Sequence, residues 1–185
     1  MAKYRLGFAI ALIVFALDQL VKWIVTGPLG VNFIGASHYL LPFFQFTYTE
    51  NNGISLGLLN ATNPLGRWML VALTAAIAVG VAIWMGREED RTDRIALGMV
   101  LGGALGNILD RTLHGYVTDF ADLRVTWIPQ ALCPSYQDGV CRPFLIFNVG
   151  DAAISIGVVI LLLRAVLTRK EHSQSSGAEE NVEHA

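Results

Sequence analysis

The sequence predicts an all-α membrane protein with a small β element, built around four transmembrane helices. Hydrophobic residues fill 54% of the 185 positions, and the mean hydropathy of +0.50 exceeds that of ordinary soluble domains. Four apolar stretches account for the excess, and each is close to the ~20 residues that cross a bilayer. They are Leu6–Thr26, Arg67–Gly86, Ile95–Leu113 and Phe147–Leu167. We therefore expect one membrane domain over residues 1–170.

The first stretch could be mistaken for a secretory signal, because Lys3 and Arg5 precede its apolar run. However, Asp18 and Lys22 stand where a cleavage site should be, and no small-x-small pattern follows. We interpret this stretch as a retained helix.

The basic residues predict the orientation of the helices. Eight of the thirteen fall on one side of the four stretches: Lys3, Arg5, Arg87, Arg91, Arg94, Arg164, Arg169 and Lys170. The positive-inside rule then places both termini in the cytoplasm and directs residues 27–66 and 114–146 outward. The net charge of −2 offers no basic surface for nucleic acid.

The first outward segment predicts a small β-sheet on the outer membrane surface. Residues 44–49 alternate apolar and polar side chains, Asn51-Asn52-Gly53 is a turn signal, and residues 54–59 could form a second strand. In the second outward segment, Pro and Gly favour a loop or a short surface helix, on which Asp122 and Asp138 would be ordinary surface charges.

That second segment also holds both cysteines of the chain, Cys133 and Cys141. A disulfide between them is plausible in an oxidising compartment, and two free thiols are the alternative. After residue 170 the chain is polar and then acidic, so we expect residues 171–185 to form a disordered cytoplasmic tail.

Carboxylates inside or beside the apolar stretches are the strongest functional signal. Each one buried in a membrane segment costs roughly 2.5–3.5 kcal/mol, which makes it a candidate site residue. Counted from the cytoplasmic ends at ~1.5 Å per residue, Asp18, Asp110 and Asp151 lie ~16, ~22 and ~20 Å along their helices. Three helices therefore place charge in one layer, in the outer third of the bilayer.

The spacing of neighbouring polar residues supports a shared layer. Asn107 lies on one helix face with Asp110 and Arg111, and Asn148 shares a face with Asp151. Structural roles are open for several of these groups. Asp18 and Lys22 have the spacing of a helical ion pair, the Asp110–Arg111 pair could clamp a helix end, and Asn148 could be a helix cap.

Asp119 and Asp151 are the best candidates for catalysis, because neither has an adjacent cation in the sequence. Two carboxylates brought together cannot both ionise easily, so one keeps a proton at neutral pH. Such a pair activates water: the ionised member takes a proton from it while the neutral member polarises a carbonyl. The chain has no HExxH and no G-x-S-x-G motif, and Lys22 is the only outward-side lysine for a Ser–Lys dyad.

Five blocks, in order, resemble the lipoprotein signal peptidases, the bacterial type II signal peptidases. The blocks are Asp18-Gln-Leu-Val-Lys22, Asn51-Asn-Gly-Ile-Ser55, Gly102-Gly-Ala-Leu-Gly-Asn-Ile-Leu-Asp-Arg111, Gly115-Tyr-Val-Thr-Asp-Phe120 and Phe147-Asn-Val-Gly-Asp-Ala152. Gly150 and Ser55-Leu56 depart from the usual family residues, and residues 124–145 are longer than the compact family pattern.

The resemblance implies an aspartic endopeptidase that needs no cofactor and no metal. It would cut diacylglyceryl-modified prolipoproteins just before the lipidated cysteine, as a monomer among the lipids of the bacterial inner membrane. Asp119 and Asp151 would be the catalytic pair. The residues expected to bind substrate or support the site are Asp18, Lys22, Asn51, Gly53, Asn107, Asp110, Arg111 and Asn148.

Two alternatives come from other functional classes. In a proton-coupled transporter, the membrane carboxylates would relay protons. The polar layer lies off the midplane, however, and the chain shows no paired halves. In a non-catalytic lipid-binding protein, the aspartates would only pair with Lys22 and Arg111.

Overall fold

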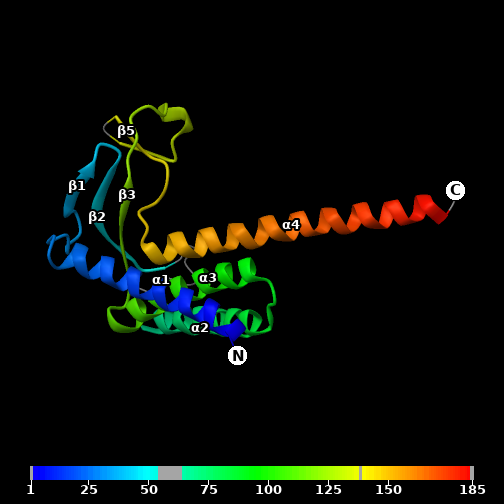
Figure 1. Cartoon of the computed structure of the whole chain (residues 1–185). Coiled ribbons are helices and arrows are strands. Elements are labelled where there is room, and N and C mark those ends of the chain that lie inside the picture. The colour runs from blue at the N-terminus through cyan, green and yellow to red at the C-terminus, as the bar shows by residue number, and fades with distance from the viewer. Residues whose placement is uncertain (1, 54–63, 138, 184–185) are drawn as a thin grey trace.

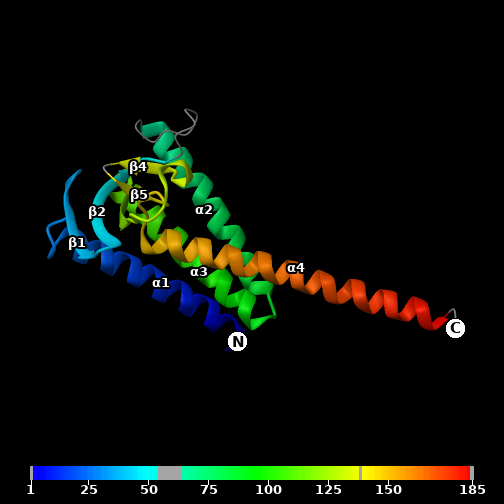
Figure 2. The same ribbon diagram turned by 90° about the horizontal axis from the view of Figure 1, so that it is seen from above.

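Four long helices and two small sheets form the chain, in a computed structural model that describes residues 2–53, 64–137 and 139–183. The helices are α1 (Ala2–Thr26), α2 (Pro64–Arg87), α3 (Arg91–Leu113) and α4 (Val149–Glu183). Helix α3 packs against all three of the others (Figures 1 and 2). The residues of α3 therefore have the most neighbours to pair with.

Three of the helices are long and apolar enough to cross a membrane: Arg5–Thr26, Pro64–Arg87 and Val149–Leu167. Their outer faces expose large apolar side chains such as Leu12, Ile77 and Leu162, which a bilayer would cover. Helix α3 is of similar length but less apolar, because its central position buries polar groups among the other helices. The predicted span over residues 95–113 is thus a helix of the expected length without a strongly apolar exterior.

Small residues let α1 and α4 approach α3 closely. A Cβ added to Gly98, Gly102 or Gly106 would collide with the backbone or side chains of α1, at Gly7, Ala11 and Asp18 respectively. On another face of α3, Gly103 lies in the same kind of contact with Gly150 of α4. This close approach brings the polar side chains of three helices within hydrogen-bonding reach of one another.

A short turn joins α2 to α3 at the same end of the helices as the start of α1, where a Cβ added to Gly7 would meet Met85 and the carbonyl of Arg94. Asp90 caps α3 by accepting hydrogen bonds from the backbone N–H groups of Thr92 and Asp93. Arg164 of α4 forms ion pairs with Asp90 (3.0 Å) and Asp93 (2.7 Å). These pairs tie α4 to the start of α3, at the end of the helices opposite the sheet (Figure 1).

The larger sheet has three antiparallel strands in the order β1-β2-β3. Strands β1 (Ser37–Leu41) and β2 (Phe44–Asn51) are joined directly, whereas β3 (Val117–Leu123) follows α3. The predicted strand over residues 44–49 is confirmed as part of β2. The second strand expected over residues 54–59 lies outside the described residues. Among the described residues, β2 pairs with β1 and with β3.

Strand β3 corrects the prediction of loop or short helix for the second outward segment. Residues Val117–Asp122 are all buried, so the strand lacks the alternation of exposed and buried residues that a half-exposed strand shows in sequence. A short helix does occur further along, as a single 3-10 turn over Gln130–Leu132.

The rest of the segment forms a disulfide-linked hairpin. Strands β4 (Ser135–Gln137) and β5 (Val140–Arg142) pair in an antiparallel manner, and Cys133 is bonded to Cys141 with the two Cα atoms 5.7 Å apart. The disulfide predicted from the sequence is therefore present in the structure, and the free-thiol alternative is not.

Helix α4 continues to Glu183, where the composition predicted a disordered tail from residue 171. No proline interrupts residues 168–183, and an existing helix adds further residues without a new nucleation cost. The boundary of the membrane domain at residue 170 stays a prediction.

Candidate active site

The start of α4 is a capping box formed by Asn148 and Asp151. The Asn148 Oδ1 atom accepts a hydrogen bond from the backbone N–H of Asp151 at 2.8 Å, and the Asp151 carboxylate accepts one from the backbone N–H of Asn148 at 3.3 Å. Asn148 is therefore a helix cap, one of the roles that the sequence left open. The same contacts fix the orientation of the Asp151 carboxylate.

The chain just before α4 runs alongside β3 and brings this capping box to Asp119. Phe147 pairs with Ala121 of β3 through backbone hydrogen bonds. The next residue, Asn148, donates from Nδ2 to Asp119 Oδ1 at 2.7 Å. From the other side, Asn51 at the end of β2 donates to Asp119 Oδ2 at 3.0 Å. Both Asp119 oxygens thus accept hydrogen bonds from amide side chains.

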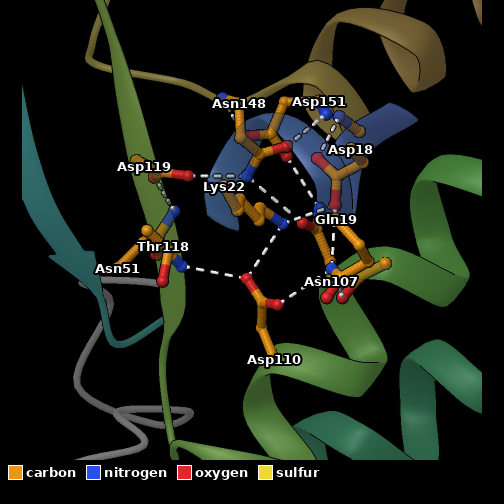
Figure 3. Close-up of polar contacts among 12 residues, drawn as sticks. Asp18, Gln19, Lys22, Asn51, Asn107, Asp110, Thr118, Asp119, Asn148 and Asp151 are labelled. Carbon is orange, nitrogen blue, oxygen red and sulfur yellow. Dashed lines mark hydrogen bonds and ion pairs between the residues drawn. The ribbon is translucent and has the colours of Figure 1, made fainter. Parts of the chain in front are cut away.

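Asn107 of α3 connects the two carboxylates predicted to be catalytic. Its Nδ2 donates to Asp151 Oδ1 at 2.8 Å, and its Oδ1 accepts from Asn148 Nδ2 at 3.2 Å. Asn148 and Asn107 therefore link Asp119 to Asp151 through a continuous chain of side-chain hydrogen bonds (Figure 3). Residues from β2, α3, β3 and α4 meet in this network.

The environment of Asp119 favours its protonated form. Burial, followed by the negative charge of Asp151, raises the pKa of Asp119 to about 7 from its ordinary value of 3.8, against the opposing hydrogen bonds from Asn51 and Asn148. The side chain is only 1% exposed. Asp119 can therefore hold a proton near neutral pH while it remains next to a second carboxylate.

A second polar cluster lies directly behind this pair. Lys22 of α1 forms ion pairs with Asp18 (2.6 Å) and Asp110 (2.9 Å), and all three side chains are almost fully buried. The Asp18–Lys22 ion pair left open by the sequence is thus present. Asp110 pairs with this lysine across helices, and no ion pair joins it to Arg111 among the described residues.

Each carboxylate of that cluster also holds the backbone next to one member of the candidate pair. Asp18 Oδ1 accepts from the N–H of Gly150 at 2.8 Å, and Asp110 Oδ2 accepts from the N–H of Thr118 at 3.1 Å. Gly150 precedes Asp151 and Thr118 precedes Asp119 in the chain. We call Asp18, Lys22, Asp110 and Gln19 the brace, because they join the supports of both carboxylates.

Gln19 belongs to the brace but was not singled out from the sequence. Its Nε2 donates to Asp18 Oδ2 and Asp110 Oδ1, both at 3.1 Å. Gln19 follows Asp18 directly in the first of the five blocks that resemble the family, and that position is the feature of the sequence that could have identified it. Gln19 gives the two carboxylates a second common donor besides Lys22.

The candidate pair borders a cavity of about 730 Å³ on the side of Asp119. Arg111 lines this cavity, and its buried Nε has no hydrogen-bond partner among the described residues. Asn51 and Gly53 line it as well, at a turn where the Gly53 N–H donates to Asn51 Oδ1 and Gly53 takes a φ of 101°. The arginine and this turn can both contact a peptide next to Asp119.

Asp122 is a correction to the sequence prediction. It was expected to be a surface charge, yet it is 1% exposed and accepts hydrogen bonds from Gln45 (2.7 Å), Thr47 (2.9 Å) and Arg142 (3.2 Å). These partners lie 20 to 77 residues away in the chain, so no local pattern pointed to them. The companion prediction for Asp138 lies outside the described residues.

Comparisons with known proteins show the family to which this chain belongs. The family model described as signal peptidase (SPase) II matches residues 10–167. The lipoprotein signal peptidase of Rhizorhabdus wittichii is 47% identical over 89% of this chain and 88% of its own. The lipoprotein signal peptidase of Sphingopyxis alaskensis is 46% identical over 92% and 91%.

The fold is also similar to a solved structure. A bacterial membrane enzyme determined by the in meso method at 2.3 Å resolution matches with a TM-score of 0.68 and 26% identity, over 90% of each chain. The family model covers far more than half of the residues, and relatives well above 30% identity match nearly the whole length. This chain therefore belongs to the signal peptidase II family.

Proposed function

We propose that this protein is a membrane aspartic endopeptidase that removes signal peptides from diacylglyceryl-modified prolipoproteins, cutting just before the lipidated cysteine. The observation that carries the proposal is the pair Asp119 and Asp151, joined through Asn148 and Asn107 beside a cavity. Family membership supports the reaction class, and the pair supplies the groups that an aspartic mechanism needs.

The two carboxylates take different roles in the proposed mechanism. Asp151 is the ionised member and removes a proton from a water molecule, which attacks the scissile carbonyl carbon. Asp119 is the protonated member and donates its hydrogen to the carbonyl oxygen as negative charge develops there. When the tetrahedral intermediate collapses, one of its two hydroxyl groups returns a proton to Asp119 as the carbonyl re-forms. The C–N bond breaks, and the proton now on Asp151 passes to the leaving amine of the cysteine.

The substrate would reach the pair from the bilayer. A second cavity of about 340 Å³, beside Asp151, is lined mainly by apolar residues of α4 and the chain before it, including Phe147 and Ile156. Such a lining suits hydrocarbon, either an acyl chain of the modified cysteine or the apolar core of the signal peptide. A lipid anchor would then hold the cysteine at the depth of the pair.

The proposed enzyme crosses the inner membrane four times as a monomer, with both termini in the cytoplasm. The apolar exteriors of α1, α2 and α4 support three of the crossings, and the close packing of α3 among them supports the fourth. The disulfide supports an outward position for the sheet and the hairpin, because disulfides persist in oxidising compartments.

The test is cleavage of a diacylglyceryl-modified prolipoprotein by the purified protein in detergent, with the products identified by mass. Wild-type protein should cut just before the modified cysteine. Asp119→Asn and Asp151→Asn should each lose at least about three orders of magnitude in turnover, because each removes one half of the acid–base pair. Glu89→Gln, at an exposed position distant from the site, is the matched control and should cleave normally.

Thermal unfolding should show that both asparagine variants remain folded, since asparagine keeps the size of the side chain. Near-normal cleavage by either variant would refute the assigned pair. A folded wild-type protein without any cleavage would instead favour a transporter or a non-catalytic lipid-binding protein, and proton flux in proteoliposomes would separate those two.

A further inference from the structure

The disulfide hairpin, defined by its described residues 133–137 and 139–142, has no role in the mechanism above. It lies beyond the C-terminal end of β3 (Figure 1). Its strands β4 and β5 pair with Ser135 opposite Arg142 and Tyr136 opposite Cys141. The disulfide closes the hairpin at Cys133. A short hairpin held in this way presents a fixed surface.

The hairpin is also attached firmly to the sheet that carries Asp119. Val125 and Cys141 exchange two backbone hydrogen bonds of 2.9 and 2.8 Å, and Cys141 is fully buried. Arg142 Nε lies 3.2 and 3.3 Å from the two oxygens of Asp122. Asp122 is three residues after Asp119 on β3, so the position of the hairpin is coupled to that of the candidate catalytic residue.

One face of the hairpin forms a wall of the cavity that contains Asp119. Ser135 and Arg142 line the same 730 Å³ cavity as Asp119 and Arg111. Among the described residues, two guanidinium groups therefore border this space together with one carboxylate. The side chain of Asp122 is 0% exposed whereas that of Arg142 is 26% exposed, so the positive end of this ion pair is the accessible one.

The substrate segment that could reach this wall follows from the geometry of the proposed reaction. The signal peptide before the cleaved bond is apolar and stays in the bilayer, and the lipidated cysteine is anchored there. The residues after the cysteine lead away from the membrane. The hairpin lies at the end of the molecule opposite the loop between α2 and α3 (Figure 1). The substrate residues after the cysteine would therefore pass the hairpin.

We propose that the disulfide hairpin is a specificity-determining surface that contacts the substrate residues directly after the lipidated cysteine and favours acidic residues over basic ones there. This inference rests on the proposed function. The positive charge of Arg142, with Arg111 across the cavity, attracts a carboxylate and repels an ammonium group. Ser135 stands beside Arg142 on the same wall and sets how close the substrate can come.

The experiment compares three diacylglyceryl-modified prolipoproteins that differ only at the second and third residues after the start of the mature chain, with Asp, Asn or Lys at both. For the wild type, kcat/KM should be roughly three- to fivefold higher for the Asp substrate than for the Lys substrate, the size expected of a partly exposed charge contact. The difference should shrink at high salt, because screening weakens contacts between exposed charges.

Charge substitutions at Ser135 give the sharpest variants, because this side chain is exposed and lines the cavity. Ser135→Lys should increase the preference for Asp, and Ser135→Glu should reduce or reverse it. Gln130→Glu is the matched control: it adds the same charge at an exposed position that does not line the cavity, and should leave the preference unchanged.

Two further variants test how the surface is held. Arg142→Gln combined with Asp122→Asn removes the cation without leaving an unpaired buried carboxylate, and should abolish the preference. Cys133→Ser combined with Cys141→Ser should weaken the preference by loosening the hairpin. For both double variants the measured quantity is the ratio of kcat/KM for the Asp substrate to kcat/KM for the Lys substrate, because a uniform loss of activity would leave this ratio unchanged.

The outcomes separate the two proposals. If the wild type cleaves all three substrates equally and the Ser135 variants behave like the wild type, the hairpin inference is wrong while the peptidase function stands. If the wild type cleaves none of the three, the proposed function fails first. A preference that changes sign between Ser135→Lys and Ser135→Glu, but not in Gln130→Glu, would establish the hairpin as the determinant.

Discussion

Lys22 is buried between two carboxylates, which is a costly arrangement of charge. Burial of an ion pair is compensated only where every remaining polar atom is also satisfied. Here Asp18 and Asp110 each accept a backbone N–H in addition to the lysine, and Gln19 donates to both. The charges are therefore retained for the position that they impose on Gly150 and Thr118, beside the candidate pair.

Removing the lysine should be strongly destabilising. Lys22→Met leaves Asp18 and Asp110 buried with no cation between them, and we expect a loss of about 3–5 kcal/mol in the free energy of unfolding. Thermal unfolding in detergent measures this loss. The double variant Lys22→Met with Asp18→Asn should recover part of it, because one buried charge is gone; no recovery would mean that the lysine contributes mainly by packing.

The proton on Asp119 makes activity depend on pH in a definite direction. With a pKa raised to about 7, Asp119 is protonated below that pH and ionised above it. The proposed mechanism uses the protonated form, so kcat/KM should fall as the pH rises through 7. The profile should be measured with a substrate that has no group titrating there. A rate that stays constant to pH 9 would exclude Asp119 as the general acid.

The raised pKa of Asp119 also makes the free energy of unfolding decrease as the pH rises. Between pH 3.8 and about 7 the folded protein keeps a proton on Asp119 that the unfolded chain releases. The contribution of this residue to the free energy of unfolding is therefore greatest below pH 3.8 and is lost as the pH rises toward 7.

At the scale of elements, the helices were predictable and the strands were less so. The four apolar stretches lie within α1 to α4 or differ from them by a few residues at the ends, because a run of about 20 apolar residues has few alternatives to a helix in a bilayer. Strand β3 was missed because both of its faces are buried. It forms by pairing with β2, which lies 66 or more residues earlier in the chain.

The candidate site likewise has residues that the sequence predicted and contacts that it did not. Asn107, Asp110 and Asn148, Asp151 have helical spacing, so their grouping was evident in the sequence. The contacts of Asp122 with Gln45 and Arg142 depend on how β2, β3 and β5 come together, and no local signal marks them. No local signal in the sequence marks the hydrogen bonds from the backbone N–H groups of Gly150 and Thr118 to Asp18 and Asp110 either.

Close packing of α1 on α3 should be sensitive to a single methyl group. In Gly106→Ala the new Cβ would meet Asp18 Oδ2, the atom that pairs with Lys22. We expect a loss of about 1–3 kcal/mol in stability from overpacking and a clear loss of activity. Unfolding and cleavage assays test both.

Gly80→Ala is the matched control, because a Cβ at Gly80 of α2 would meet nothing within 4 Å. Gly80→Ala should leave the free energy of unfolding unchanged or raise it by about 0.5–1 kcal/mol, since alanine has a higher helix propensity than glycine. If Gly106→Ala and Gly80→Ala have equal stability and equal cleavage activity, α1 and α3 are less closely packed than in the structure.

At the scale of the whole molecule, the orientation can be tested by labelling. We expect the α2–α3 loop to face the cytoplasm and the 3-10 turn before the hairpin to face outward. In spheroplasts, a membrane-impermeant maleimide should label Gln130→Cys but not Glu89→Cys, and inverted vesicles should give the reverse; both positions are exposed. The native cysteines form a disulfide and should not react. The opposite pattern would place the candidate pair on the cytoplasmic side.

The hydrogen bond from Gly150 to Asp18 joins residues 132 positions apart. The candidate pair therefore acquires its full support only after the last helix has been synthesised and has docked against the first. A ribosome-bound or truncated chain that ends before α4 has one carboxylate of the pair and half of its supports. Proteolytic capacity should consequently appear in a single late step of biogenesis, so partly inserted chains would be harmless to other membrane proteins.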